Sequence, residues 1–361
     1  QLEYLTAAFV DFIWGTPLLV LLVGGGLYFA LFSRFLAYRH MVHAVGIMLG
    51  RYDTPREPGE LTHAQALAAA LSGTLGLGNI AGVALAIVAG GPGAVFWMWV
   101  SALLGISTKL FTCSLGIMYR GRDSLGHLRG GPQYIIREAL PRSFYPLAIL
   151  FSAAGLIGTL PMFQANQLTA LLRETVAVGT DPEVFNIIAG LLIAALVAAV
   201  VFGGLSRVAK VSVALLPTMA LTYLGMTIFV LVKHHAEVPG MFALIFREAF
   251  HPQAVGGGLL GVMLIGISRG VFSNEAGLGT EVMAHGAART SEPIREGLVA
   301  TLGPVIDTLM ICTCTALVIL ISGLWQVPGE LNGVAMTLTA LQAEMGFVAV
   351  ILLTVVVLIL S

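Results

Sequence analysis

Long uninterrupted runs of apolar residues recur along the whole chain, and this pattern limits its fold more than any other feature. A helix needs about 20 residues to cross a hydrocarbon core of about 30 Å, whereas a strand of a membrane barrel has about ten residues of alternating polarity. The runs in this chain are continuous and have the helical length. Only 10% of the residues are charged, against about 25% in a soluble domain. The sequence therefore predicts an all-α polytopic membrane protein.

Nine apolar segments are expected to form membrane helices, and clusters of Pro, Gly and charged residues separate several of them. They cover residues 13–32, 64–90, 94–119, 145–172, 184–203, 208–232, 254–285, 296–323 and 346–361. The last segment is short for a span and ends without a polar cap, so the chain is expected to be a fragment of a longer protein.

Basic residues fall mainly in the loops on one side of these segments, with thirteen Lys and Arg residues there and three on the other side. Loops rich in Lys and Arg stay in the cytoplasm. This bias predicts an integral plasma-membrane protein, in a bacterial or archaeal inner membrane, whose N-terminus faces outward. The net charge of −1 gives no indication of nucleic-acid binding.

Two of the nine segments, the second and the seventh, have a glycine-rich and polar middle: "LSGTLGLGNIAG" at 71–82 and "GISRGVFSNEAGLGTE" at 266–281. Each such glycine weakens a helix by about 1 kcal/mol relative to Ala. Irregular backbone is tolerated at membrane depth only where it is buried in protein or lines a watery cavity. A break also leaves free N–H groups on one half-helix and free carbonyl groups on the other, so it can bind a carboxylate and a cation.

The two broken helices are five segments apart and therefore cross the membrane in opposite directions, as inverted repeats require. A pair of glycine-interrupted segments in corresponding positions indicates the central site of a secondary transporter. Close helix packing is the other common use of small residues in membrane helices. It would explain "GTLGLGN" alone equally well, but a second polar break in a matching helix favours a transport site.

Other classes of membrane protein predict different features. An enzyme would need His and carboxylate side chains clustered in the membrane, whereas the eight histidines lie nearly all in loops. A channel or a receptor that does not couple ion flow to transport would keep the same broken helices. The sequence thus predicts no enzyme and no cofactor, and it leaves the channel and the receptor as alternatives to a transporter.

Four blocks resemble the alanine-or-glycine:cation symporter family: "SGTLGLGNIAGVALAI…GGPGAVFWMW" (72–99), "RGGPQYI" (129–135), "RGVFSNEAGLGTE" (269–281) and "GLVATLGPVIDTLMICTCTALVILISG" (297–323). The resemblance implies an eleven-helix symporter with the leucine-transporter fold, which takes up alanine or glycine with sodium by alternating access. In this fold an added first helix precedes two inverted five-helix repeats. The implied parts are the added helix and a cytoplasmic linker (1–63), the first repeat (64–233), an extracellular loop (234–253) and an incomplete second repeat (254–361).

The sodium ligands are implied by a further resemblance of the first block, through "GLGN", to the broken helix of the neurotransmitter:sodium symporters. Position by position, Thr74 and Asn79 would face one sodium next to the substrate. The carbonyl groups of Ser72 and Leu75 would face a second sodium, together with the hydroxyl of Ser361.

The same resemblance implies that backbone N–H groups near Leu77 and Gly78 hold the substrate carboxylate. In the second break, Ser273 and Asn274 are best placed to meet an amino group or an ion, and Phe272 is the expected apolar wall. The substrate-binding residues expected are Gly73, Thr74, Gly76, Leu77, Gly78, Phe272, Ser273 and Asn274.

The ion that drives transport is expected to be sodium, because the donors at the first break are neutral oxygen atoms and nothing between Leu71 and Gly82 can titrate. Two acidic residues at membrane depth, Glu275 and Asp307, are nevertheless candidates for a functional role. Glu275 is expected either to take part in transport or to pair with Arg269 or cap a half-helix. Asp307 is expected to be a satisfied structural group. Proton coupling therefore stays open, and the oligomeric state is not predicted.

Overall fold

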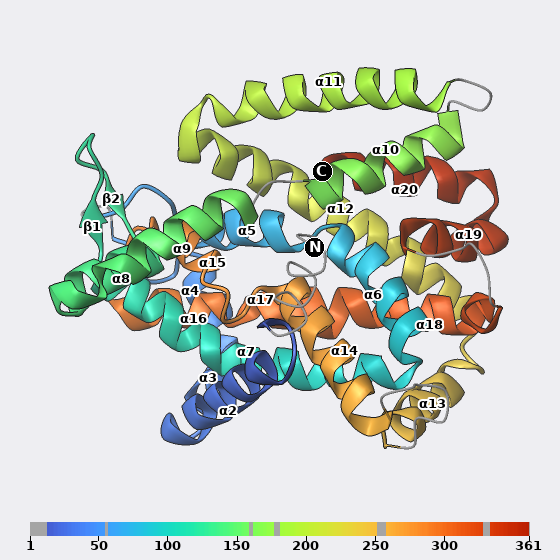
Figure 1. The fold of residues 1–361 in the computed structure, drawn as a ribbon, viewed down its shortest axis with the longest axis horizontal. Helices are drawn as coiled ribbons and strands as arrows, with labels where there is room; N and C mark the ends of the chain where they lie inside the picture. Colours follow the sequence, from blue (N-terminus) through green and yellow to red (C-terminus); the bar gives the residue numbers. More distant parts are fainter. Residues whose placement is uncertain are drawn as a thin grey trace, which may run out of the picture.

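The computed structural model describes residues 13–54, 57–158, 162–176, 181–250, 258–327 and 333–360, and these residues are mostly helical (Figure 1). The described elements are α2 (Thr16–Phe32), α3 (Leu36–Arg39), α4 (Met41–Met48), α5 (His63–Thr74), α6 (Leu77–Gly90), α7 (Gly93–Met118), β1 (Gly121–Arg122), β2 (Leu128–Arg129), α8 (Pro132–Ala139), α9 (Tyr145–Gly158), α10 (Met162–Val176), α11 (Pro182–Val201), α12 (Gly204–Lys233), α13 (Val238–Phe250), α14 (Gly258–Asn274), α15 (Glu281–His285), α16 (Pro293–Ala300), α17 (Leu302–Pro304), a π-helix (Val305–Cys312), α18 (Thr313–Ser322), α19 (Gly333–Met345) and α20 (Phe347–Leu360), with two short 3₁₀ helices at Arg142–Phe144 and Leu324–Gln326.

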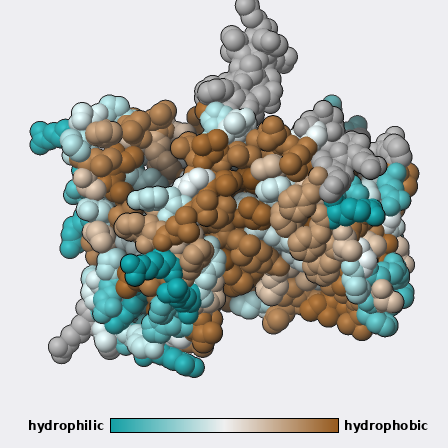
Figure 2. Space-filling view, turned by 90° about the horizontal axis from the view of Figure 1, so that it is seen from below, coloured by the Kyte–Doolittle hydropathy of each residue, from teal (hydrophilic) through white to brown (hydrophobic). Residues whose placement is uncertain are grey.

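Several of the described helices are long and apolar enough to cross a membrane. They are α7, α11, α12 and the continuous stretch Pro293–Ser322, and the pair α5 and α6 is a further candidate that bends by 41°. In Figure 1 most of them run along the long axis, with the hairpin of β1 and β2 at one end and α13 and α19 at the other. Figure 2 shows a broad hydrophobic surface across the middle of one face and hydrophilic residues gathered toward its two ends. The predicted mostly helical class with apolar helices able to span a membrane is confirmed, while the number of spans and the leucine-transporter arrangement stay predictions.

Helix α7 is the centre of the bundle and packs against α14, α16, α2 and α13. Its contact with α14 is very close because α14 carries glycine there: a Cβ at Gly266 would collide with the Ala94 carbonyl oxygen, and one at Gly270 would lie 2.9 Å from the Ser101 Cβ. Small residues at such contacts let membrane helices approach closely. Helices α7 and α14 therefore form one interlocked pair.

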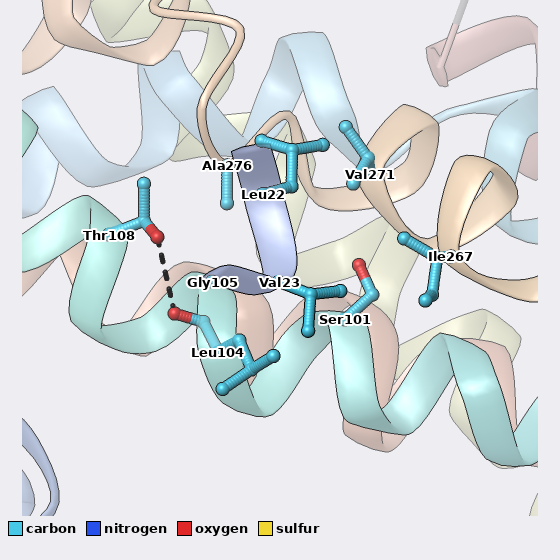
Figure 3. Close-up of a pocket in the computed structure, with 9 residues that line it drawn as sticks. All are labelled: Leu22, Val23, Ser101, Leu104, Gly105, Thr108, Ile267, Val271 and Ala276. Atoms are coloured by element: carbon cyan, nitrogen blue, oxygen red, sulfur yellow. Dashed lines mark hydrogen bonds between the residues drawn. The ribbon is translucent and has the colours of Figure 1, made fainter. Parts of the chain in front are cut away.

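The first helix, α2, closes onto this pair. Figure 3 shows Leu22 and Val23 of α2 facing Ser101 of α7 and Ile267 of α14 around a cavity of about 10 Å³. That volume is about one water-sized sphere. The space between α2, α7 and α14 is thus packed and too small for an organic substrate.

Three stretches differ from the predicted segments. The segment 145–172 comprises two helices, α9 and α10, and residues 159–161 between them lie outside the described part of the chain. The expected loop 234–253 contains α13, and the stretch after segment eight contains α19. Both helices have 13 residues, so a search for runs of about 20 residues passes over them.

Helix α13 packs against α7 through aromatic side chains. The rings of Phe246 and Phe250 lie 5.5 and 5.0 Å from the ring of Phe96 in α7, and the Trp97 indole N–H donates to the Ala249 carbonyl at 3.2 Å. Aromatic pairs at such distances stabilise a contact beyond the area they bury. The "VFWMW" motif therefore packs against the neighbouring helix α13.

Candidate functional site

The first interrupted helix begins at a capping box. Thr62 accepts a hydrogen bond from the Gln65 N–H, and the Gln65 side chain accepts one from the Thr62 N–H. Helix α5 ends at Thr74, because Leu75 and Gly76 leave helical geometry, and α6 follows at an angle of 41°. The break predicted from the glycines is confirmed. The last carbonyl groups of α5 and the first N–H groups of α6 lack helical partners there, so opposite partial charges meet at one point.

The first half of the second interrupted helix, α14, ends at Asn274. The Asn274 side-chain oxygen accepts a hydrogen bond from the Ala276 N–H at 3.0 Å. Glu275 follows with a left-handed φ of 54°, and Gly277 has a φ of 92°. Such backbone costs a residue with a side chain roughly 1–2 kcal/mol. The Glu275 carboxylate accepts a hydrogen bond from the Thr280 hydroxyl, which closes the loop before α15 begins. The second predicted break is confirmed as well.

Five polar side chains meet where the two breaks approach each other: Asn79 of α6, Ser273 and Asn274 of α14, and Asp307 and Thr308 of the π-helix. We call them the polar cluster. Each is at most 1% exposed. The Asn79 amide donates to the Asp307 carboxylate, the Ser273 Oγ lies 3.1 Å from Asp307 Oδ2, and the Asn274 amide donates to Thr308 Oγ1 at 3.3 Å. The cluster thus ties both broken helices to the π-helix.

Oxygen acceptors outnumber the protons available around Ser273. Its Oγ lies within hydrogen-bonding distance of three oxygens, namely Asp307 Oδ2, Asn79 Oδ1 at 3.4 Å and Thr308 Oγ1 at 3.2 Å. A hydroxyl has one proton, so it can donate to only one of them at a time. A site with surplus hard oxygen atoms and one carboxylate suits a small cation.

The helix that carries Asp307 is itself irregular. Residues Val305–Cys312 form a π-helix within the longer stretch Pro293–Ser322. π-helical turns are rare and often mark functional sites, because the wider turn redirects side chains. Here Asp307, Thr308 and Cys312 all reach Ser273.

A cavity of about 680 Å³ lies beside the two breaks. Its walls come from α5 and the start of α6, from the second break with α15, and from α9 and α10. The volume is within the range of about 300–1,000 Å³ that is typical of small-molecule sites. The Phe272 side chain lies against Gly78, since a Cβ at Gly78 would be 3.6 Å from the Phe272 ring. The two breaks therefore share one cavity wall.

The predicted site residues separate into two groups. Those that line the cavity are Ser72, Gly73, Thr74, Gly76, Gly78, Phe272 and Glu275. Those that are buried beside it are Leu75, Leu77, Asn79, Ser273, Asn274 and Asp307. Ser361 lies outside the described residues. Ser273 and Asn274, expected to meet the substrate, thus belong to the polar cluster rather than to the cavity wall. Among the described residues Glu275 makes no ion pair with Arg269; its partner is Thr280.

Sequence reasoning missed Glu281 and did not find the partner of Lys109. Lys109 of α7 is 2% exposed and interacts electrostatically with the carboxylates of Glu281 and Asp307. Glu281 is 2% exposed and accepts a hydrogen bond from the Thr112 hydroxyl at 3.3 Å. The acidic residue directly after "GLGT" was the available signal, because buried carboxylates are rare unless they are paired.

Two interrupted apolar helices around one cavity, with a buried carboxylate between them, are typical of a membrane transporter. The chain belongs to the sodium:alanine symporter family, whose family model matches residues 1–361.

Proteins similar to the chain are named as transporters or symporters. It is 38% identical over 359 residues to an uncharacterized transporter of Haemophilus influenzae, and the alignment covers 96% of this chain and 75% of that protein. It is 37% identical over 343 residues to the sodium/alanine symporter AgcS of Methanococcus maripaludis, over 93% of this chain and 74% of that protein. It is 34% identical over 359 residues to the probable sodium/glutamine symporter GlnT of Bacillus subtilis, over 98% of this chain and 73% of that protein. The chain is thus similar to sodium-coupled amino-acid carriers along nearly all of its length.

Proposed function

We propose that this chain is the transport core of a symporter that couples inward sodium flow to uptake of a small neutral amino acid, alanine or glycine. The observation that carries the proposal is the meeting of both interrupted helices at one cavity and one polar cluster. Alternating access would open this site first to one side of the membrane and then to the other. Each sodium ion that enters contributes about 2.3 kcal/mol per 100 mV of membrane potential.

The substrate would bind across the two breaks. N–H groups at the start of α6, near Leu77 and Gly78, have no helical partners and carry partial positive charge, so they suit a carboxylate. Glu275 lines the same cavity and supplies a carboxylate for the substrate ammonium. Phe272 lies against Gly78 and supplies the apolar wall. A zwitterion with a small side chain fits this pairing of groups.

One sodium would occupy the polar cluster. Its donors would be the Asp307 carboxylate and the oxygens of Asn79, Ser273 and Thr308, which are hard ligands. The Thr74 hydroxyl is committed to the Leu71 carbonyl at 3.4 Å, so it would contribute only after it rotates. A second sodium at the carbonyls of Ser72 and Leu75 with Ser361 remains a prediction from the resemblance.

Uptake into liposomes tests this proposal. The purified protein would be reconstituted and given radiolabelled alanine or glycine under an inward sodium gradient, an inward potassium gradient or a proton gradient alone. Saturable accumulation that needs sodium is the expected result. Competition by unlabelled glutamine measures whether the cavity also admits an amino acid with a longer side chain. Flux that never exceeds the external concentration would contradict coupling and favour a channel.

Proton coupling is the second candidate, and the buried carboxylates favour it. Asp307 and Glu281 are at most 2% exposed and lie beside the cavity or in its wall, and intramembrane carboxylates are common proton carriers. The same liposomes distinguish the two ions, because accumulation driven by a proton gradient without sodium would assign coupling to these carboxylates.

A further inference from the structure

A buried side-chain cluster outside the cavity joins three separate helices. The Nδ1 of His63 pairs with Glu296 Oε2, and the Nδ1 of His285 lies 2.5 Å from Glu296 Oε1. All three side chains are at most 1% exposed. One carboxylate therefore accepts hydrogen bonds from two imidazoles, and we call these three residues the histidine clasp.

The clasp joins the ends of both interrupted helices. His63 is the first residue of α5, His285 is the last residue of α15, and Glu296 lies in α16. These are the half-helices that wall the cavity: Ala70 of α5 and Ala284, the residue before His285, both line it. The clasp thus lies where these two walls end.

Backbone pairing reinforces the same junction. Leu61 and Ala288 form a parallel bridge, in which the Arg289 N–H donates to the Leu61 carbonyl at 2.6 Å and the Leu61 N–H donates to the Ala287 carbonyl at 3.1 Å. The Arg120 guanidinium donates to the Ala288 carbonyl at 2.7 Å. The residue segments before α5 and after α15 are therefore fastened together next to the clasp.

Glu296 is the member on which the clasp depends. Within the described part of the chain, the buried Nε2 atoms of His63 and His285 have no hydrogen-bond partner, although His63 Nε2 lies 3.6 Å from Asp53 Oδ1. Each imidazole is thus bound through Nδ1 to the same carboxylate. Loss of that carboxylate would remove the side-chain contact of both half-helices with α16 at once, and would leave two buried imidazoles without their partner, which is destabilising.

We propose that the histidine clasp is the gate at the arginine-rich end of the transport path, the end that the charge bias predicts to be cytoplasmic. The clasp holds α5 and α15 against α16 while the cavity is closed on that side, and its three side chains part when the cavity opens there. This gate rests on the proposed function, because it assumes alternating access.

Cysteine labelling measures the gate without relying on transport. Ala70→Cys would be the only cysteine in a chain with Cys113→Ala, Cys312→Ala and Cys314→Ala, and inside-out vesicles would be treated with a membrane-impermeant maleimide. Glu296→Gln is expected to raise the labelling rate at least fivefold. The matched control is Glu292→Gln in the same region, whose carboxylate is exposed and pairs with Arg295, and it should leave the rate unchanged. An unchanged rate in the folded Glu296→Gln protein would overturn the gate.

A reversible cross-link tests the gate with the clasp intact, and thus also covers a Glu296→Gln chain that does not fold. Leu61→Cys with Ala288→Cys would be oxidised in liposomes after the native cysteines are replaced. Sodium-driven uptake is expected to stop on oxidation and to return on reduction. Uptake that continues unchanged in the cross-linked protein would overturn the gate. If the wild-type chain takes up no alanine or glycine while Glu296→Gln still accelerates labelling, the proposed substrate and coupling fail, but the clasp still controls access to the cavity.

Discussion

The Asp307 carboxylate lies where the two interrupted helices and the π-helix meet, and its hydrogen-bond partners are neutral groups of Asn79 and Ser273. Asp307→Asn keeps the shape of the side chain and removes its charge. We expect the sodium concentration for half-maximal uptake to rise roughly tenfold, which is about 1.4 kcal/mol, because hydrogen bonds and ion contacts of charged groups are the stronger ones. Titration of uptake against sodium measures the change.

The control for this substitution is Asp181→Asn, which removes a carboxylate from the exposed N-cap of α11. Asn caps a helix about as well as Asp, so uptake should keep its sodium dependence. If Asp307→Asn also leaves the sodium requirement unaltered, the ion does not bind at the polar cluster.

We propose that Gly78, in the cavity wall, limits the size of the substrate side chain. A methyl group there would enter the cavity at ordinary contact distance, 3.6 Å, from the Phe272 ring. Gly78→Ala should therefore fold, and it should reduce alanine uptake more than glycine uptake, by about fivefold in relative rate, a difference of roughly 1 kcal/mol such as one methyl group makes. Competition between the two labelled amino acids measures the ratio. Gly155→Ala adds a methyl in open space at another wall of the same cavity, and an equal effect there would contradict this role.

The sequence could predict which residues form the breaks but not which side of each helix they face. The glycines and polar residues of 71–82 and 266–281 predict irregular backbone in these two helices. The sequence does not show that the Ser273 side chain lies against Asp307 rather than in the cavity wall. The position of Asp307 depends on the wider turn of the π-helix that carries it. Asp307 was predicted to be a satisfied structural group, and its hydrogen bonds confirm that it has partners. Its role in coupling stays a proposal.

At the scale of elements, α12 and α19 are joined at their ends by charge. Lys233 and His234 at the end of α12 lie 2.7 and 3.1 Å from Glu344 of α19. The carboxylates of Glu237 and Glu344 raise the pKa of His234, and Lys233 and His234 lower the pKa of Glu344. A raised histidine pKa stabilises the folded state below the unfolded value of about 6.5, and this contribution is lost as the pH rises through the folded value.

We therefore expect His234→Gln to lower the melting temperature of the solubilised protein at pH 6 and to have little effect at pH 8.5. Thermal unfolding at the two pH values checks this. His235→Gln is the matched control, because the His235 ring bonds to the Val232 carbonyl rather than to a carboxylate. A decrease of the same size at both pH values would show that His234 acts by packing alone.

Hydropathy predicts the helices that are long and apolar enough to cross a membrane. Long apolar runs such as α7 and α12 follow from length and composition. Helices α13 and α19 do not, because each has 13 residues and exists through contacts with distant parts of the chain. The Thr337 hydroxyl of α19, for example, donates to the Ile80 carbonyl at 3.0 Å. Such tertiary contacts have no signature in a local sequence window.

At the scale of the whole molecule, the hydrophobic middle and the two polar ends define a direction across the membrane (Figure 2). The excess of Lys and Arg predicts that the end with β1 and β2 is cytoplasmic. A single cysteine at Leu125, which is 79% exposed between these strands, should react with an impermeant maleimide only in inside-out vesicles. A single cysteine at the exposed His235 should react in intact cells. The opposite pattern would reverse the predicted orientation.

The histidine clasp also constrains how the protein is made. His63 and Glu296 are 233 residues apart in the chain, and ribosomes add about 5–20 residues per second. The first half of the molecule therefore waits in the membrane for roughly 10–50 s before the carboxylate that binds its imidazole has been synthesised. During that interval α5 has neither His285 nor Glu296 as a partner. The newly made N-terminal half must consequently remain in the membrane over this interval without the clasp.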